Sequence, residues 1–325
     1  MAYKIAVVGP IPHDTIITHK GETIIKYGCV THPTIALSRL LEGLGEVIPI
    51  SQVNKRDVSE ITELFKPYSN INTNGILSDA NQGTTIELKF LDQNNRQEKQ
   101  LSNMKPISPE DVKPFLDVDA FVFVPITDFE VELDTLKFIK ENSDAKVIFD
   151  AHGPTTYVTN QGKRLRKYWK DKDDWLPYID VLKMNLEESI CSWVDEDYST
   201  GELYDENRTD HLNDFAKATL NKGVEYLYVT LDSRGCAIFF KENNDLKQEF
   251  IKSVAVSNVV DTTGCGDSFA GGLSYGFTLH NDYVKAAHYA NALGAMRTQG
   301  KGFDVFKNLE DTNKIISSNY SSTLL

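Results

Sequence analysis

The chain has 325 residues, of which 41% are hydrophobic and 25% are charged, and its formal net charge is −13. This composition is typical of a folded globular protein and excludes the disordered and collagen-like classes. The acidic balance argues against partners held mainly through phosphate charge, so we expect neither nucleic acid nor a membrane as a partner. The longest apolar run, residues 120–126, is far below the roughly 18 residues that a membrane span needs.

Strand-like and helix-like patterns alternate along most of the chain. In chain order we expect a strand at 3–8, a helix at 31–44, a strand at 47–51, a helix at 58–65, a strand at 120–124, a helix at 131–142, strands at 146–150 and 181–184, helices at 186–194 and 214–222, strands at 226–231, 237–241 and 254–260, and helices at 267–278 and 283–297. Such alternation predicts an α/β fold with a central, mostly parallel sheet flanked by helices.

A β-rich stretch interrupts this alternation. Residues 71–77, 84–91 and 97–101 alternate in polarity, and 92–95 read as a hairpin turn. We therefore expect one α/β domain over 1–325 that carries a small β-sheet lid, formed by inserts at about 14–30 and 70–103. A small sheet has one apolar face that needs cover, so the lid is also a candidate homodimer contact.

The cysteines and the N-terminus both favour a cytoplasmic location. The four cysteines, at positions 29, 191, 236 and 265, form no CxxC pair, which gives no support for a zinc site or a redox motif. Reduced thiols are the simplest reading of so few cysteines in so long a chain. The first residues lack the pattern of a signal peptide and read as a strand.

The strongest signal is the string at 261–272, Asp-Thr-Thr-Gly-Cys-Gly-Asp-Ser-Phe-Ala-Gly-Gly, which opens an apolar helix. Gly264 and Gly266 allow backbone amides to turn inward, and with the helix N-terminus they form an anion hole suited to a phosphate. Asp267 stands in the first helical turn, where a carboxylate can take a proton from an attacking hydroxyl group. A lone aspartate there is simply a favourable residue for a helix start. A helix start does not, however, require two glycines, two threonines and an aspartate together.

This string resembles, nearly residue for residue, the C-terminal signature of the ribokinase-like (PfkB) family of ATP-dependent sugar and nucleoside kinases. The resemblance implies a ribokinase-like fold, with ATP and Mg²⁺ as cofactors. It also implies that Asp267 is the catalytic base and that the amides of Gly264, Cys265 and Gly266 bind the transferred phosphoryl group.

Two further segments resemble the nucleotide side of that family. Asn185-Leu-Glu-Glu188 resembles an Asn-x-x-Glu motif that helps to hold the Mg²⁺–phosphate water network. The same residues also read as a helix cap, and both roles can hold together. Thr230-Leu-Asp-Ser-Arg-Gly235 resembles a nucleotide-contacting Thr-Leu-Gly-x-x-Gly turn, with Asp232 where glycine is usual.

The substrate side matches less well. Gly9-Pro-Ile-Pro-His-Asp14 resembles the family's Gly-x-x-x-x-Asp, in which the aspartate holds substrate hydroxyl groups, although a proline-rich loop is the alternative. The family's Gly-Gly pair followed by an Asn reads here as Tyr27-Gly28-Cys-Val-Thr-His32, so only Gly28 clearly matches. The resemblance implies substrate contacts at Asp14, Gly28 and His32.

Two weaker features remain. Asp261 and Thr263, with backbone from 298–302, lie where some members of the family bind a monovalent cation, which makes K⁺ a candidate cofactor. Residues 163–167, Lys-Arg-Leu-Arg-Lys, form a basic cluster that is most simply a solvated face, with anion binding as the alternative.

These features together predict a kinase that transfers the γ-phosphoryl group of ATP to a hydroxyl group of a small sugar or related polyol. A nucleoside kinase of the same family and a non-catalytic sugar or nucleotide sensor are the alternatives. A nicotinamide-dependent enzyme is disfavoured because residues 9–14 lack the Gly-x-Gly-x-x-Gly fingerprint, and a Walker-type kinase because its phosphate loop does not occur. The departures at the substrate side leave the identity of the sugar open.

Overall fold

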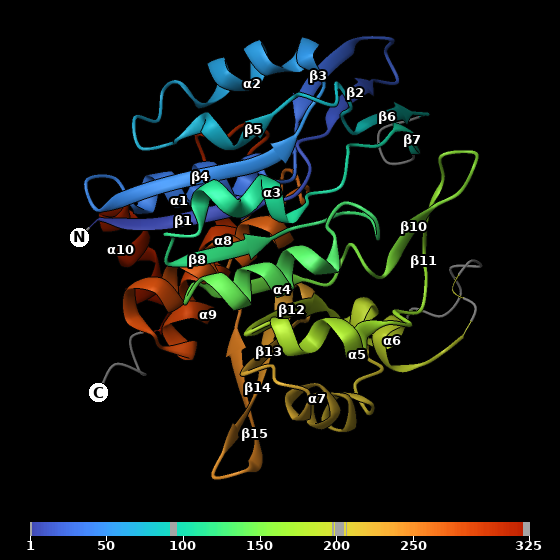
Figure 1. Ribbon diagram of the computed structural model, residues 1–325. Coiled ribbons are helices and arrows are strands. Elements are labelled where there is room, and N and C mark those ends of the chain that lie inside the picture. The colour runs from blue at the N-terminus through green and yellow to red at the C-terminus, as the bar shows by residue number, and fades with distance from the viewer. Residues whose placement is uncertain (1, 92–95, 197, 199–204, 206, 321–325) are drawn as a thin grey trace.

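A nine-stranded sheet with the order β15-β14-β13-β12-β9-β8-β1-β4-β5 runs through the computed structural model, which describes residues 2–91, 96–196, 198, 205 and 207–320 (Figure 1). In that order the strands are Asp245–Lys252, Gly235–Glu242, Tyr226–Thr230, Val181–Asn185, Lys146–Asp150, Ala120–Phe123, Tyr3–Val8, Gly45–Gln52 and Ile76–Leu77. Neighbours from β13 to β5 pair in parallel, and β14 and β15 add an antiparallel edge. The expected α/β class is confirmed.

Helices cover both faces of this sheet because its strands are apolar on both sides. Along β1, Ile5 and Val7 enter one core, whereas Ala6 and Val8 enter the other. One layer holds α1 (Thr31–Leu40), α8 (Cys265–His280), α9 (Tyr283–Arg297) and α10 (Leu309–Tyr320), and α2 (Val58–Phe65) packs beside it. The other holds α3 (Pro109–Val112), α4 (Leu133–Asn142), α5 (Lys172–Trp175), α6 (Leu186–Trp193) and α7 (Leu212–Asn221). Among the described helices, none is both long and apolar enough to cross a membrane.

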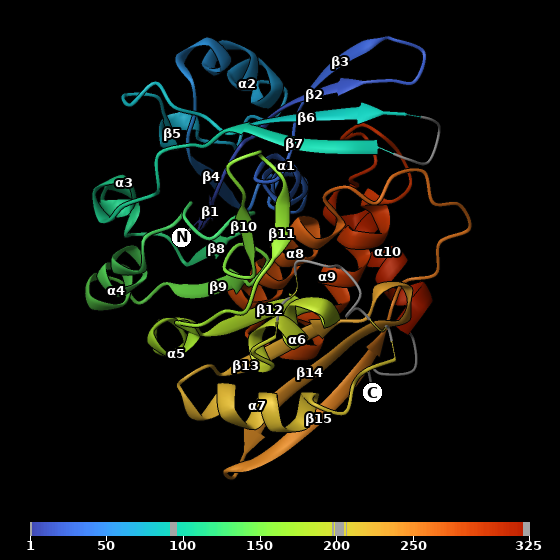
Figure 2. The same ribbon diagram turned by 90° about the vertical axis from the view of Figure 1, so that its right-hand side faces the viewer.

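A small separate sheet follows the end of β1 (Figure 2). Its order is β3-β2-β6-β7, with strands Thr23–Tyr27, His13–Ile17, Thr85–Phe90 and Arg96–Ser102. The expected range of 70–103 begins too early, because β5 at Ile76–Leu77 pairs in parallel with the end of β4 and so extends the main sheet. The expected hairpin turn at 92–95 lies outside the described residues.

The prediction of a strand at 254–260 is wrong. This segment has no regular secondary structure, and the unpredicted strand β15 lies just before it. The amides of Val260 and Asp261 donate to the carbonyl group of Thr298 at 2.7 and 3.3 Å. The end of this segment therefore bonds to the turn after α9 and not to a neighbouring strand. Within the described residues, the hairpin of β10 (Thr156–Val158) with β11 (Arg164–Arg166), the short helices α3 and α5 and the C-terminal helix α10 were also unpredicted.

Helices α8 and α9 pack at very short range through glycine. A Cβ atom on Gly272 or Gly276 would overlap the backbone of Ala290 or Ala286 on the facing helix. Because these glycines are four residues apart, they share one face of α8. The close approach holds α8 firmly against its neighbour, and the N-terminus of α8 carries the glycine-rich string.

We therefore expect Gly276→Ala to lower the free energy of unfolding, because overpacking costs about 1–3 kcal/mol and the gain in helix propensity returns at most about 1 kcal/mol. Gly294→Ala is the matched control, since its Cβ would make only ordinary contacts with Cys265 and Phe269, 3.5 and 4.0 Å away. Urea denaturation measures both. Equal stability of the two variants would contradict the packing described here.

Candidate active site

The glycine-rich loop turns the chain directly into α8. Gly264 is the N-cap, with a left-handed φ of 82° that favours glycine. A Cβ atom there would also overlap the His32 ring. The amide of Ser268 donates to the carbonyl group of Gly264, which is the first helical hydrogen bond of α8. The amides of residues 265–267 therefore have no partner within the helix. Of these, Cys265 N–H donates to the carbonyl group of Thr262 at 3.2 Å, so one of the expected anion-hole donors is already engaged.

Asp267 lies in the first turn of α8 and is partly exposed. Burial of its carboxyl group raises the pKa to about 6, while the positive charge of Lys183 opposes this shift. The negative charge of Glu188 adds to it. A carboxyl group with this pKa is mostly ionised at neutral pH and is more basic than an ordinary aspartate, which suits a general base.

A buried ion pair lies beside the loop. Lys183 Nζ on β12 is 2.7 Å from Asp150 Oδ2 on β9, and the two side chains are 5% and 3% exposed. The same Nζ lies 3.0 Å from the position that a Cβ atom on Gly266 would take. Burial alone would lower the pKa of Lys183, but the surrounding carboxylates, that of Asp150 first, raise it above its usual value. A fixed positive charge therefore lies against the glycine loop.

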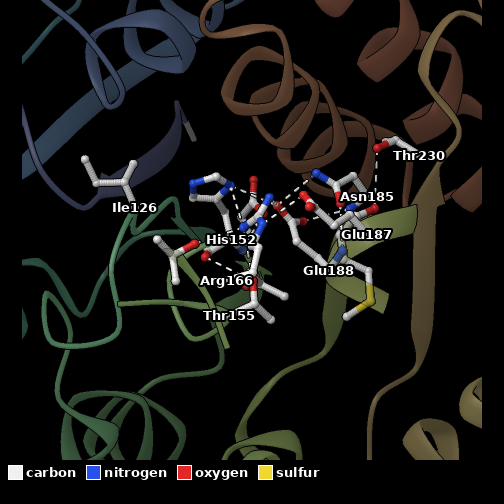
Figure 3. A network of polar contacts seen from close by, with 12 residues as sticks. Ile126, His152, Thr155, Arg166, Asn185, Glu187, Glu188 and Thr230 are labelled. Atoms are coloured by element: carbon white, nitrogen blue, oxygen red, sulfur yellow. Dashed lines mark hydrogen bonds and ion pairs between the residues drawn. The ribbon is translucent and has the colours of Figure 1, made fainter. Parts of the chain in front are cut away.

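Glu188 is the centre of a polar network at the start of α6 (Figure 3). Asn185 Oδ1 accepts from the Glu188 amide at 2.8 Å, and Glu188 Oε2 accepts from the Asn185 amide at 2.8 Å. This is the capping box that the spacing predicts. The other oxygen, Oε1, contacts His152 Nδ1 at 2.8 Å and Arg166 Nη2 at 3.3 Å. Burial would raise the pKa of Glu188, but the bond with His152 and the charge of Arg166 hold it well below its usual range.

These contacts limit how a magnesium ion can be held. Both carboxylate oxygens of Glu188 already accept hydrogen bonds from the protein, and the side chain is 1% exposed. Across the described part of the chain, no group of three or more His, Cys, Asp or Glu side chains is arranged to hold a metal. The residues near Asn185 therefore fit an ion held through phosphates and water, and they do not fit one bound directly by Glu188.

The β10–β11 hairpin brings two arginines of the basic cluster into this network. Arg166 Nε donates to Glu187 at 2.9 Å, and Arg164 Nη1 donates to Glu98 on β7 at 2.8 Å. Arg164 Nη2 also lies 3.1 Å from His152 Nε2. With side-chain exposures of 17% and 19%, these arginines do not form the solvated face that the sequence favours. Their partners come from elements far away in the sequence.

The residues predicted to bind substrate line one cavity of about 880 Å³, between the small sheet and the segment that leads into the loop. Asp14 and Gly28 lie close together there, since a Cβ atom on Gly28 would be 3.1 Å from Asp14 Oδ2. His32 reaches the wall of the cavity but is only 5% exposed. Residues 262–263 extend the wall to the loop, while Asp267 is not one of its lining residues.

The turn predicted to contact nucleotide, from Thr230 to Gly235, follows β13. Thr230 Oγ1 donates to the Met184 carbonyl group at 3.4 Å, which places the turn beside the end of β12. Asp232 has a φ of 52°, in the left-handed region that glycine would supply and that aspartate tolerates better than most residues. A Cβ atom on Gly235 would overlap the carbonyl group of Ile251. The aspartate at 232 therefore adopts a backbone conformation of the kind that glycine favours.

The residues expected at a monovalent cation site surround a buried arginine. Arg297 Nη2 at the end of α9 donates to Asp261 Oδ2 at 3.2 Å, and the amide of Thr263 donates to Asp261 Oδ1 at 2.9 Å. Burial would raise the pKa of Asp261, but the bonds from Thr263 and the charge of Arg297 hold it below its usual value.

Sequence reasoning missed Lys183, Asp150 and Arg297, and it named Arg166 only as part of the basic cluster. For Lys183 a signal exists, because a lysine inside a strand that is apolar on both faces needs a buried partner. No comparable local pattern marks Arg297 at the end of an alanine-rich helix, since its contacts depend on the tertiary fold.

We expect Lys183→Met to reduce turnover and to destabilise the fold by about 3–5 kcal/mol, because Asp150 is left as an unpaired buried charge. The double variant Asp150→Asn, Lys183→Met removes both charges, so its free energy of unfolding should return toward that of wild type while turnover stays low. Urea denaturation and an ADP-release assay measure the two properties. Recovery of turnover along with stability would show that Lys183 acts only through folding.

Comparison with known proteins gives independent evidence on the family and the fold. The model of the pfkB family carbohydrate kinase matches residues 36–307. The 2-dehydro-3-deoxygluconokinase of Bacillus subtilis (strain 168) is 30% identical over 134 residues, which are 41% of this chain and 38% of that protein. The aminoimidazole riboside kinase of Salmonella typhimurium is 27% identical over 206 residues, which are 60% of this chain and 57% of that protein. The matches span less than two thirds of either relative.

The likeness in structure is broader. A fructokinase double mutant from Vibrio cholerae O395, solved with fructose, ADP and a potassium ion bound, has a TM-score of 0.73 at 16% identity and covers 97% of this chain and 98% of that chain. At this identity the likeness shows the ribokinase-like fold, with its large mixed sheet and small separate sheet. Because the family model extends from α1 to the loop beyond α9, this chain belongs to the pfkB family of carbohydrate kinases.

Proposed function

We propose that this chain transfers the γ-phosphoryl group of ATP to a hydroxyl group of a small sugar or related polyol, with Asp267 as general base. The observation that carries the proposal is the place of Asp267, in the first turn of α8 directly after the glycine loop, with a pKa raised to about 6. A proton acceptor and a helix N-terminus that favours negative charge thus lie within one turn of each other.

In the proposed step, the acceptor hydroxyl group gives its proton to the Asp267 carboxylate. Its oxygen bonds to the γ-phosphorus while the bond to the bridging oxygen breaks, so ADP leaves. The amides of Gly264 and Gly266 and the ammonium group of Lys183 would stabilise the charge on the transferred group.

The nucleotide side is assigned to the ends of β12 and β13. Asn185 and Glu188 would hold the water network around the phosphates, and the turn from Thr230 to Gly235 would contact the nucleotide. Mg²⁺, held by phosphates and water, supplies charge neutralisation between the β- and γ-phosphates when it is bound.

The acceptor is assigned to the cavity of about 880 Å³, which lies within the range of small-molecule sites. Asp14 can accept hydrogen bonds from two neighbouring hydroxyl groups, as a sugar offers. Gly28 leaves room beside that carboxylate, and His32 closes the wall toward the loop. A nucleoside is the closest rival acceptor, because the apolar side chains of Ile16 and Leu88 in the same cavity could hold a base.

Two further properties are proposed with this function. The free state of all four cysteines supports a cytoplasmic location. The exposed apolar side chains of Ile24, Ile25 and Leu101 on the small sheet support a homodimer through that sheet.

We expect Asp267→Asn to lower kcat by roughly 10²–10⁴, the usual scale for loss of a general base. Because the pKa of Asp267 is raised to about 6, wild-type kcat should rise as pH increases through about 6 and level off above it, where the carboxylate is ionised. In the variant this acid limb should disappear. Steady-state rates across pH measure both effects.

Asp134→Asn is the matched control, since Asp134 on α4 is 74% exposed and contacts only its neighbour Lys137 among the ion pairs seen in the described residues. It should keep wild-type rates. Near-wild-type turnover in Asp267→Asn would remove Asp267 from the role of base. Full activity of wild type well below pH 6 would contradict it in the same way.

ADP release across a panel of sugars, sugar acids, sugar phosphates and nucleosides tests the choice of acceptor. With an accepted sugar, Asp14→Ala should raise KM with little change in ATP binding, because each charge-assisted bond that it loses is worth about 1.5–3 kcal/mol. Turnover with nucleosides alone would replace the sugar by the rival acceptor. Binding of sugar or nucleotide without any transfer would favour the sensor.

A further inference from the structure

The guanidinium group of Arg297 occupies the place between the residues that the family resemblance assigns to a monovalent cation. Nη2 donates to Asp261 Oδ2 at 3.2 Å, and Nη1 donates to the carbonyl group of Gly300 at 2.5 Å. Nε donates to His32 Nδ1 at 3.1 Å. The arginine is 2% exposed, so the contacts form inside the protein and not at its surface.

The oxygens that K⁺ would need are already engaged. Asp261 uses Oδ2 for Arg297 and Oδ1 for the amide of Thr263. The carbonyl group of Thr298 accepts from the amides of Val260 and Asp261. A second cation beside a buried guanidinium would also meet strong repulsion. The residues present therefore do not fit a bound K⁺.

We propose that Arg297 is a built-in cation that takes the place of a monovalent activator, so that this kinase works without K⁺. This inference rests on the proposed kinase function only where enzyme activity is measured. Arg297 acts as a positioning residue, because it holds Asp261 and through it the loop that leads to Gly264. It does not touch the reacting groups.

The histidine at position 32, where the family expects an asparagine, fits the same arrangement. Its ring lies between Arg297 Nε and the backbone of Gly264, and it packs against Phe303 with ring centroids 5.2 Å apart. Burial and the charge of Arg297 lower the pKa of His32 to about 3, so the ring is neutral and its Nδ1 can accept. His32 and Arg297 thus form one unit behind the loop.

The first test needs no variant. Activity and melting temperature of wild type are measured in K⁺-free buffer with added KCl or with choline chloride at equal ionic strength. We expect neither quantity to differ between the two salts, because no site remains for the ion. Specific activation of wild type by KCl, or specific stabilisation, would overturn the proposal.

Variants test the role of the arginine itself. Arg297→Ala should lose roughly 10–100-fold in kcat, the scale seen when a residue that orients a metal ligand by hydrogen bonding is removed. In this variant KCl or guanidinium chloride at low concentration, but not choline chloride, should raise both activity and melting temperature. Arg297→Lys keeps a cation in the same place and should lose less activity than Arg297→Ala.

Arg39→Ala is the matched control, because Arg39 on α1 is a partly exposed arginine paired with Glu42. An Arg297→Ala variant no less active than Arg39→Ala would contradict the positioning role. If no acceptor is phosphorylated by wild type, the proposed function fails, and the melting temperatures in the two salts still decide whether Arg297 replaces the ion.

Discussion

The pairing of buried charges around the N-terminus of α8 is the constraint on which the candidate site depends. Each ion taken out of water costs several kcal/mol unless a partner lies close by. Three pairs surround the loop, namely Lys183 with Asp150, Arg166 with Glu188, and Arg297 with Asp261. Asp267 stands among them with a pKa raised to about 6, so it is held close to the point at which it can exchange a proton near neutral pH.

These pairs also join parts of the fold that the chain order separates. The two residues of each pair lie on different segments of the chain, and the fold brings them together around the N-terminus of α8. The β10–β11 hairpin extends the network to the small sheet, since Arg164 contacts Glu98 and the Gln100 amide donates to the carbonyl group of Gly162 at 2.8 Å. Movement of the small sheet would therefore be felt by the residues around Glu188, which suits a lid that excludes water during transfer.

Local patterns in the sequence were enough to predict much of the fold, together with the glycine loop and the capping box of the candidate site. The capping box at Asn185 and Glu188 and the left-handed Gly264 depend on neighbouring residues, so their sequence signals are direct. The apolar, β-branched run at 254–260 gave a misleading signal, because the Val260 amide donates to the Thr298 carbonyl group and the Ala255 amide to the Asn319 side chain, and not to a strand. Arg164 was predicted only as part of a solvated basic cluster, and no local pattern marks Arg297, since only the tertiary fold brings Glu98 and Asp261 to them.

The most direct test of the central assignment is a crystal structure with ADP, aluminium fluoride and an acceptor that the enzyme phosphorylates. We expect the fluoride anion at the amides of Gly264 and Gly266 beside Lys183, and the acceptor hydroxyl group within hydrogen-bond distance of the Asp267 carboxylate. Binding of the anion elsewhere, or an acceptor hydroxyl group directed away from Asp267, would contradict the assignment of the base and of the anion hole.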